Sequence, residues 1–225
     1  MTRQLLVSLA CGLCAIAVHA ASPQVELKTN LGEIVLELND ELAPKTVANF
    51  LRYVQDGHYN GTIFHRVIEG FMIQGGGMDE TLTEKPARAP IENEANNGLK
   101  NETGTVAMAR TNDPHSARAQ FFINVANNDF LNFRSPDAKN WGYAVFGKVI
   151  KGMDIVRKIE KRPTRSGGMY ENVPVDAVVI ESARVLLESA PEKAPENKVK
   201  AANVPAPAPK GKGAASDKRN KTKTQ

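Results

Sequence analysis

Residues 64–77, FHRVIEGFMIQGGG, contain the side chains of this chain that are best suited to chemistry. Arg66 supplies a cation and Gln74 an amide, and apolar residues surround both beside three consecutive glycines. The stretch has no cysteine or serine that could attack a substrate, and His65 has no acidic partner nearby in the sequence. Such a set can hold a peptide by an apolar side chain and place a guanidinium against its backbone. This pattern favours a conformational reaction over bond cleavage.

Three further blocks follow in order: GTVAMAR at 104–110, QFFIN at 120–124 and YAVFGKV at 143–149. Together with the first block they resemble the cyclophilin peptidyl-prolyl cis/trans isomerases, and most closely the short-loop bacterial periplasmic branch. The resemblance runs from about residue 25 to residue 187, and four ordered blocks are far more specific than any single pattern. It implies an isomerase that forms no covalent intermediate and needs no cofactor.

In this family the catalytic role falls on an arginine that matches Arg66. Its guanidinium would hydrogen-bond toward the prolyl nitrogen and favour the twisted imide over the planar one. Phe71, Met72, Phe122 and Leu131 match the wall that binds the proline ring. Taken without that context, an arginine is more often a solvated residue or half of a surface ion pair, and each apolar residue is more often ordinary core.

Two glutamines and one strand complete the expected site. Gln74 matches a family glutamine that bonds the substrate backbone near the arginine, and Gln120 lies within the site in the same way, although a polar surface role is the alternative for Gln120. Ala109 and Arg110 match the strand that borders the substrate groove, where backbone groups pair with the peptide. Because many members have Asn at the position of Arg110, the contribution of this side chain stays open.

The chain departs from the family pattern at several site positions. Phe130 stands where cyclosporin-sensitive members carry Trp, and Tyr143 stands where many have His. Glu69 replaces a usual proline in a loop, a change that should leave the chemistry intact. We therefore expect Phe130 and Tyr143 to border the groove, and we expect cyclosporin to bind poorly because the indole donor is missing.

The remaining candidate ligands do not form a metal or phosphate site. His58 and His115 are isolated, both cysteines of the chain lie within residues 1–20, and paired carboxylates do not occur at ligand spacing. Residues 75–77 resemble a phosphate loop only superficially, because no Lys-Ser or Lys-Thr follows. They indicate a turn that needs positive φ and close packing. We expect neither a metal nor a cofactor.

The elements that must position these residues can be inferred from hydrophobic periodicity. Alternating apolar residues on either side of Asn30 predict a hairpin of two half-buried strands. Pro44 and apolar residues at helical spacing up to Gly57 predict an amphipathic helix. A second helix is expected at 153–160, opened by Gly152. Further strands are expected at 63–68, 71–74, 105–110, 121–125, 144–149 and 175–187.

Many short strands with only two helices favour a closed antiparallel barrel or a sandwich. The resemblance selects the barrel. The fold class is therefore predicted as mainly β, a closed eight-stranded antiparallel barrel capped by two α-helices.

The 225-residue chain divides into three segments. Residues 1–20 combine Arg3, an apolar run at 5–18 and, at Val18 and Ala20, small or aliphatic residues at the two positions that a signal peptidase reads, which predicts a secretory signal cleaved after Ala20. A membrane anchor is the alternative, but fourteen apolar residues fall short of the ~20 needed to span a bilayer. Lipid modification of Cys11 or Cys14 is a weaker alternative. Residues 21–188 form the isomerase domain, and an exported, periplasmic or secreted, protein is expected.

The C-terminal segment differs from the domain in composition and charge. Residues 189–225 are rich in Ala, Pro and Lys and hold nine Lys or Arg against three acids, whereas residues 21–188 have a net charge of −3. Too few apolar residues are present to repay the entropy of ordering the segment, so we expect a disordered tail. It is either a solubilising extension or a cationic arm for anionic surfaces. The acidic domain predicts no specific nucleic-acid binding.

The leading hypothesis is an exported prolyl isomerase that assists the folding of other exported proteins. Its partners would be proline-containing polypeptides, and it would act as a monomer. The alternative is a non-catalytic binder or chaperone that holds Pro-containing segments in the same groove, although such a binder would have no need of Arg66. A third hypothesis is an adhesin or nucleic-acid protein that acts through the basic tail.

Overall fold

The computed structural model describes residues 21–186. The predicted signal at 1–20 and the predicted tail at 189–225 lie outside the described residues. The described part is mainly β, with two α-helices, α1 (Pro44–Gln55) and α2 (Met153–Glu160). Its strands are β1 (Gln24–Thr29), β2 (Gly32–Leu38), β3 (Thr62–Ile63), β4 (Arg66–Ile68), β5 (Met72–Gly75), β6 (Thr105–Met108), β7 (Phe121–Asn124), β8 (Val145–Lys151), β9 (Thr164–Gly167), β10 (Tyr170–Pro174) and β11 (Val179–Leu186). No described helix has the length and apolar character that crossing a membrane requires.

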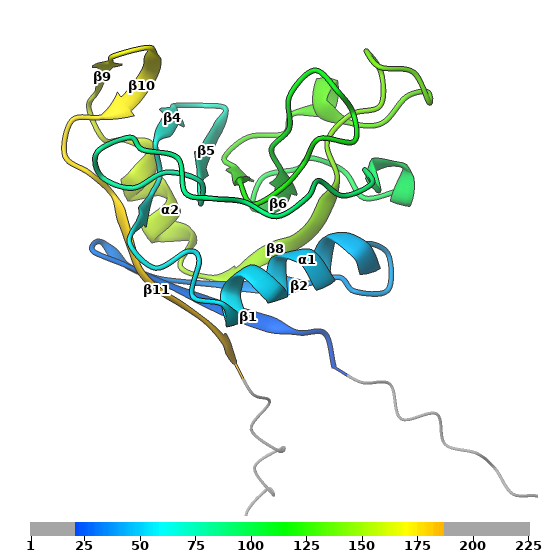
Figure 1. The fold of residues 1–225 in the computed structure, drawn as a ribbon, viewed down its shortest axis with the longest axis horizontal. Coiled ribbons are helices and arrows are strands. Elements are labelled where there is room, and N and C mark those ends of the chain that lie inside the picture. The colour runs from blue at the N-terminus through cyan, green and yellow to red at the C-terminus, as the bar shows by residue number, and fades with distance from the viewer. Residues whose placement is uncertain (1–20, 187–225) are drawn as a thin grey trace, which may run out of the picture. The chain divides into compact units, whose positions relative to one another are not determined.

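Nine strands form one antiparallel sheet in the order β3-β11-β1-β2-β8-β6-β7-β5-β4. Its two edges, β3 and β4, are consecutive in the chain and are separated only by Phe64 and His65. The curled sheet therefore closes through the chain itself (Figure 1). If residues 62–68 are counted as one interrupted strand, the barrel has the eight strands predicted from the sequence. The mainly β antiparallel architecture with two helices is thus confirmed.

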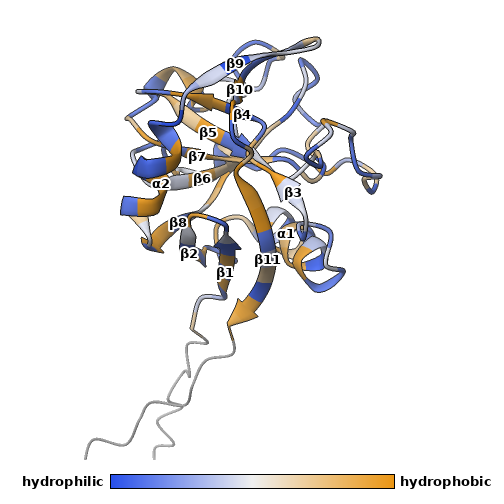
Figure 2. Cartoon of the chain, turned by 90° about the vertical axis from the view of Figure 1, so that its left-hand side faces the viewer, coloured by the Kyte–Doolittle hydropathy of each residue, from blue (hydrophilic) through white to orange (hydrophobic). Residues whose placement is uncertain are grey.

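The helices lie on opposite sides of the barrel (Figure 2). Pro44 occupies the first turn of α1, where its missing N–H costs nothing. The N-cap residue Ala43 makes no side-chain cap. Instead, the Glu94 carboxylate accepts hydrogen bonds from the backbone N–H groups of Lys45 (3.1 Å) and Thr46 (2.8 Å). A residue distant in the sequence therefore satisfies the start of this helix.

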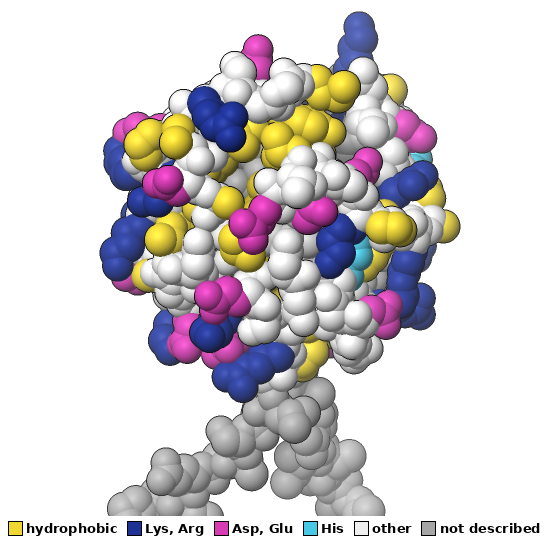
Figure 3. Space-filling view, turned by 60° about the vertical axis from the view of Figure 1, so that its left-hand side comes forward, with side chains coloured by type: hydrophobic (Ala, Val, Ile, Leu, Met, Phe, Trp, Pro, Cys, Tyr) yellow, Lys and Arg dark blue, Asp and Glu magenta, His cyan; other side chains and the backbone are white. Residues whose placement is uncertain are grey.

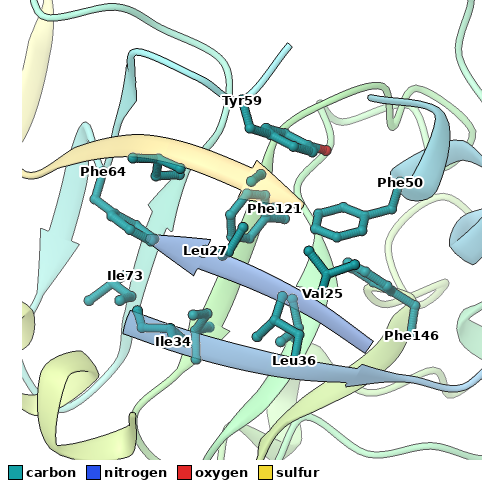
Figure 4. Packing of buried hydrophobic residues seen from close by; sticks show 14 of the residues in the cluster. Val25, Leu27, Ile34, Leu36, Phe50, Tyr59, Phe64, Ile73, Phe121 and Phe146 are labelled. Carbon is teal, nitrogen blue, oxygen red and sulfur yellow. The ribbon is translucent and has the colours of Figure 1, made fainter. Parts of the chain in front are cut away.

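Aromatic rings fill the barrel core between α1 and the sheet (Figure 4). The ring of Phe50 on α1 lies 5.1 Å from that of Tyr59, 5.1 Å from that of Phe146 and 5.6 Å from that of Phe121, measured between centroids. The Tyr59 hydroxyl, fully buried, donates to the Ala119 carbonyl at 2.9 Å. Such edge-on and tilted contacts fix the ring positions and hold the strands rigidly.

The predicted hairpin, both helices and the six further strands are present, with boundaries that shift by up to four residues. The largest shift is at the last strand, which was expected from residue 175 and begins at Val179. The sequence did not predict the β9–β10 hairpin. Three of the four β9 residues are exposed, so the strand lacks the apolar alternation that would have indicated it.

Candidate active site

The outer face of three neighbouring strands brings the predicted site residues together. Arg66 on β4 lies directly opposite Gln74 on β5, and Gln74 lies opposite Phe122 on β7. Residues that face each other across antiparallel strands project from the same side of the sheet. The guanidinium, the amide and one aromatic ring therefore form a row across the three strands.

A cavity of about 110 Å³ opens on this face. It is lined by nine of the predicted residues: Arg66, Phe71, Met72, Gln74, Ala109, Arg110, Phe122, Leu131 and Tyr143. Its floor is a small apolar cluster, separate from the barrel core, that includes Met72, Phe122 and Leu131. The cavity therefore combines an apolar wall with cationic and amide groups at its rim.

A chain of hydrogen bonds orients Arg66 at this rim. The Gln74 Oε1 atom accepts from Arg66 Nη1 at 3.4 Å, and Gln74 Nε2 donates to Gln120 Oε1 at 2.9 Å. Arg66 is half-buried and forms no ion pair within 4.0 Å among residues 21–186. Its charge is thus not neutralised by the described part of the protein and is available to a ligand in the cavity.

His65 lies beneath this chain and is almost fully buried. Burial and the neighbouring Arg66 charge lower the pKa of His65 to about 4. The imidazole is therefore neutral at pH 7 and adds no positive charge to the site. Its Nδ1 atom has no hydrogen-bond partner among the described residues.

Arg110 and Tyr143 close the opposite rim. Arg110 Nε donates to the Gly142 carbonyl at 3.0 Å and Nη1 donates to the Thr111 carbonyl at 2.8 Å. The guanidinium carbon lies 4.5 Å from the centre of the Tyr143 ring, a cation–π contact. The Arg110 side chain is thus part of the cavity wall rather than a free surface group.

The family of this chain follows from its similarity to known proteins. Residues 24–185 match the family model described as "Cyclophilin type peptidyl-prolyl cis-trans isomerase/CLD". The chain belongs to the cyclophilin family. The family and the enzyme class predicted from the sequence are therefore confirmed: this cyclophilin is a peptidyl-prolyl cis-trans isomerase.

Bacterial relatives of this cyclophilin are similar over most of their length. It is 62% identical over 162 residues to peptidyl-prolyl cis-trans isomerase cyp18 of Streptomyces antibioticus, which covers 72% of this chain and 98% of the relative. It is 56% identical over 161 residues to peptidyl-prolyl cis-trans isomerase B of Escherichia coli, with 72% and 98% covered. Among solved structures, a cyclophilin-type isomerase of Cryptosporidium parvum has a TM-score of 0.63 at 30% identity, with 74% of this chain and 98% of that chain covered. A structure of the same protein in the presence of the dipeptide Ala-Pro has a TM-score of 0.62 at 30% identity, with 73% and 99% covered.

Two predicted site residues of this cyclophilin do not line the small cavity. Phe130 is 63% exposed and stacks on Phe71, with ring centroids 5.6 Å apart. It extends the apolar rim outward instead of entering the cavity. Gln120 lines an adjoining cavity of about 400 Å³, which shares Gln74, Ala109 and Arg110 with the smaller one.

The adjoining cavity contains residues that the sequence did not single out. They lie on the irregular segments around 77–87 and 111–119 and include Glu84, Lys85 and Arg118. No periodic pattern or motif marks such segments, so only the fold places them beside Gln120. Gly77 makes room for that glutamine, because a Cβ atom at Gly77 would lie 2.3 Å from Gln120 Cγ. Of the three glycines at 75–77, Gly76 has the expected positive φ, +83°.

The turn that carries Phe71 into the wall is held from behind. The Phe71 carbonyl accepts hydrogen bonds from the Val125 backbone N–H at 3.1 Å and from Asn128 Nδ2 at 2.9 Å. One residue earlier, the Gly70 N–H donates to Glu160 Oε1 at 2.9 Å. Glu160 and Asn128 are buried polar residues far from 64–77 in the sequence, and we did not predict them.

Proposed function

We propose that this cyclophilin accelerates rotation about X-Pro peptide bonds without a covalent step, with Arg66 stabilising the twisted imide. The observation that carries the proposal is the position of the Arg66 guanidinium, un-neutralised among the described residues and held by Gln74, beside the apolar wall of the small cavity. Resonance gives the imide a rotation barrier of about 18–20 kcal/mol. Lowering that barrier by roughly 7 kcal/mol would raise the rate by about five decades.

The chemistry follows from what changes during rotation. Twisting removes conjugation, so the prolyl nitrogen becomes pyramidal and regains its lone pair. A hydrogen bond from Arg66 to this nitrogen is strong in the twisted state and weak in either planar state, which is the condition for catalysis. An apolar wall formed by Met72, Phe122 and Leu131 would hold the ring while the acyl side turns. A related cyclophilin was crystallised in the presence of Ala-Pro, which is consistent with a site for a prolyl residue.

The decisive experiment compares wild type with Arg66→Ala and Arg66→Lys in a prolyl-peptide isomerisation assay. We expect Arg66→Ala to lower kcat/KM by about two to three decades, the range for removing one preorganised transition-state donor. Arg66→Lys keeps the charge but loses the planar fork, and we expect it to recover part of the rate. If wild type and Arg66→Ala were equally inactive, the groove would serve a non-catalytic binder. If both were equally active, Arg66 would not be the catalytic group.

We propose that the protein is exported and that it assists the folding of other exported proteins. The support is the apolar segment at 5–18 followed by Ala20. Mass spectrometry of the protein from fractionated cells should find a mature N-terminus at Ala21. An intact Met1 in the cytoplasmic fraction would overturn export.

Assistance in folding can be tested separately. We expect the mature protein to accelerate the slow phase of a model protein whose refolding is limited by X-Pro isomerisation, which takes tens of seconds without a catalyst. A slow phase unchanged at catalytic enzyme concentration would contradict this part of the proposal.

The basic segment at 189–225 is proposed to attract anionic surfaces. Deleting it should reduce salt-dependent retention on an anionic matrix, because nine of its residues are Lys or Arg. Unchanged retention would leave it as a solubilising extension.

A further inference from the structure

Most of the charged residues that line the two joined cavities are cations. Arg66, Lys85, Arg110 and Arg118 line them, against a single carboxylate, Glu84. None of these five forms an ion pair within 4.0 Å among the described residues. The Lys85 ammonium is engaged by the carbonyl groups of two residues, His58 and Asn60. Four cations against one carboxylate leave the lining with a net charge of +3.

The excess positive charge of the cavity lining contrasts with the net negative charge of the domain. Residues 21–188 have a net charge of −3, and ten of the fifteen other Lys or Arg side chains in the described part are paired with Asp or Glu. The face drawn in Figure 3 mixes cationic and anionic side chains over its surface. The groove is thus a local cationic feature of an otherwise acidic and charge-paired domain. A cleft lined by one sign of charge attracts ligands of the opposite sign.

Arg110 stands where the two cavities meet, and its geometry is already fixed. Nε and Nη1 bond the carbonyls of Gly142 and Thr111, and the plane lies over Tyr143. These contacts leave Nη2 without an acceptor in the described part of the chain. A guanidinium that is already immobilised loses little entropy when it binds a carboxylate, and a half-buried charge-assisted bond is stronger than a solvated one.

We propose that the groove selects client segments that carry Asp or Glu within about three residues of the proline, with Arg110 as the residue that determines this preference. The inference rests on the proposed isomerase function, because it assumes that the proline ring occupies the small cavity. The adjoining 400 Å³ cavity begins at Gln74, Ala109 and Arg110, at the edge of the small one. A neighbouring side chain of the same peptide would enter it, and a carboxylate there would meet Arg110 and Arg118.

The test uses peptides with one proline and a single Asp or Asn placed in turn at three positions before and two positions after it. Exchange NMR measures the isomerisation rate without a coupling protease, whose own specificity would interfere. At low salt, we expect the Asp peptide to be isomerised about three- to tenfold faster than the Asn peptide when the substituted residue is at one position or at two adjacent positions. This range lies between the effect of an exposed ion pair and that of a partly buried one. At about 1 M salt, where the Debye length is about 3 Å, the preference should shrink toward unity.

The variants Arg110→Gln and Arg52→Gln form a matched pair. Both remove one positive charge, but Arg52 lies on α1 and lines none of the cavities described here. We expect Arg110→Gln to bring the Asp-to-Asn ratio close to one and Arg52→Gln to leave it unchanged. Arg110→Lys should retain an intermediate ratio, because it keeps the charge without the fixed fork.

The inference would be overturned if the Asp-to-Asn rate ratio stayed below about 1.5 at every position at low salt, where an interacting ion pair should be detectable. It would also be overturned if the variant Arg110→Gln kept the full ratio. In either case turnover of the neutral Asn peptides would show that the proposed isomerase function still holds. If no peptide were turned over, the proposed function itself would fail.

Discussion

The buried carboxylate of Glu160 gives the sharpest test of how the fold supports the site. Glu160 ends α2 and is 5% exposed. It accepts hydrogen bonds from the Gly70 N–H at 2.9 Å and from Arg157 Nη1 at 2.8 Å, and Arg157 also donates to the Val125 carbonyl at 2.6 Å. One carboxylate therefore fastens the turn before Phe71 to the helix.

The substitution Glu160→Gln removes the charge and leaves the side-chain volume nearly unchanged, so it opens no cavity. The Gln oxygen can still accept from one of the two donors, but the other donor then faces the amide NH2 group, and no carboxylate remains to balance the Arg157 charge. Charge-assisted bonds are worth roughly 1.5–3 kcal/mol and neutral ones roughly 0.5–1.5 kcal/mol. Because relief of carboxylate desolvation offsets part of this loss, we expect the free energy of unfolding to fall by about 1–2 kcal/mol at pH 7.

The effect should depend on pH in a defined direction. Burial alone would raise the pKa of the Glu160 carboxyl, but the bonds from Arg157 and Gly70 outweigh it and lower the pKa below the ordinary 4.5. A group with a lowered folded-state pKa contributes stability above its unfolded pKa and loses it as the pH falls through the folded value. The difference in unfolding free energy between wild type and Glu160→Gln should therefore shrink as the pH falls below the ordinary carboxyl pKa of 4.5.

Urea unfolding at pH 7 and at pH 3.5 measures the loss of stability and its dependence on pH. Initial rates of prolyl isomerisation measure the effect on activity. Because the turn positions Phe71, we expect kcat/KM to fall by about two- to fivefold, mainly through KM. Lys158→Ala is the control on the same helix. It breaks only the exposed pair with Asp154 and should cost less than about 0.5 kcal/mol. Equal stability of Glu160→Gln and wild type at pH 7 would refute the reasoning.

Three further predictions concern other parts of the domain. His65 has a folded-state pKa of about 4 against an ordinary 6.5, so the unfolded chain binds more protons than the folded chain between these two pH values. The free energy of unfolding, measured with a chemical denaturant, should therefore fall by up to about 3 kcal/mol as the pH drops from 6.5 to 4. The substitution His65→Gln should remove this dependence on pH. Gly76→Ala should cost about 2–4 kcal/mol in thermal or urea unfolding, since φ is +83° and a Cβ atom would lie 2.8 Å from the Phe121 ring; a change below 1 kcal/mol would contradict it. Cyclosporin should require concentrations far above nanomolar to inhibit, because Phe130 lacks the indole donor, and nanomolar inhibition would contradict this.

The elements most accurately predicted from the sequence are those whose signals are local. Helix α2 has the predicted bounds, Met153–Glu160, because Gly152 in a left-handed conformation precedes it and Pro163 follows it closely. The β1–β2 hairpin likewise follows from alternation around one turn. By contrast, the β9–β10 hairpin has an exposed first strand and lies beyond the reach of any periodic pattern.

The supporting contacts of the site were harder to predict because they join distant segments. Glu160 meets Gly70 across 90 residues, and Asn128 meets Phe71 across 57. In the sequence, Glu160 is one more acidic residue near a helix end, where a solvated side chain would be the natural interpretation. Only the position of α2 against the turn makes it a buried hydrogen-bond acceptor.

The strands of the site show why periodicity could not separate site from core. In β7 all four residues are buried, although Ile123 faces the barrel core and Phe122 faces the cavity. In β5 the same division separates Ile73 from Met72. A strand covered on both faces is apolar throughout, so its pattern cannot reveal which face binds a ligand. The polar side chains in the row across the sheet, Arg66 and Gln74, mark the outer face as a place where apolar contact and charge are combined, and the proposed mechanism for rotation of a prolyl imide depends on that combination.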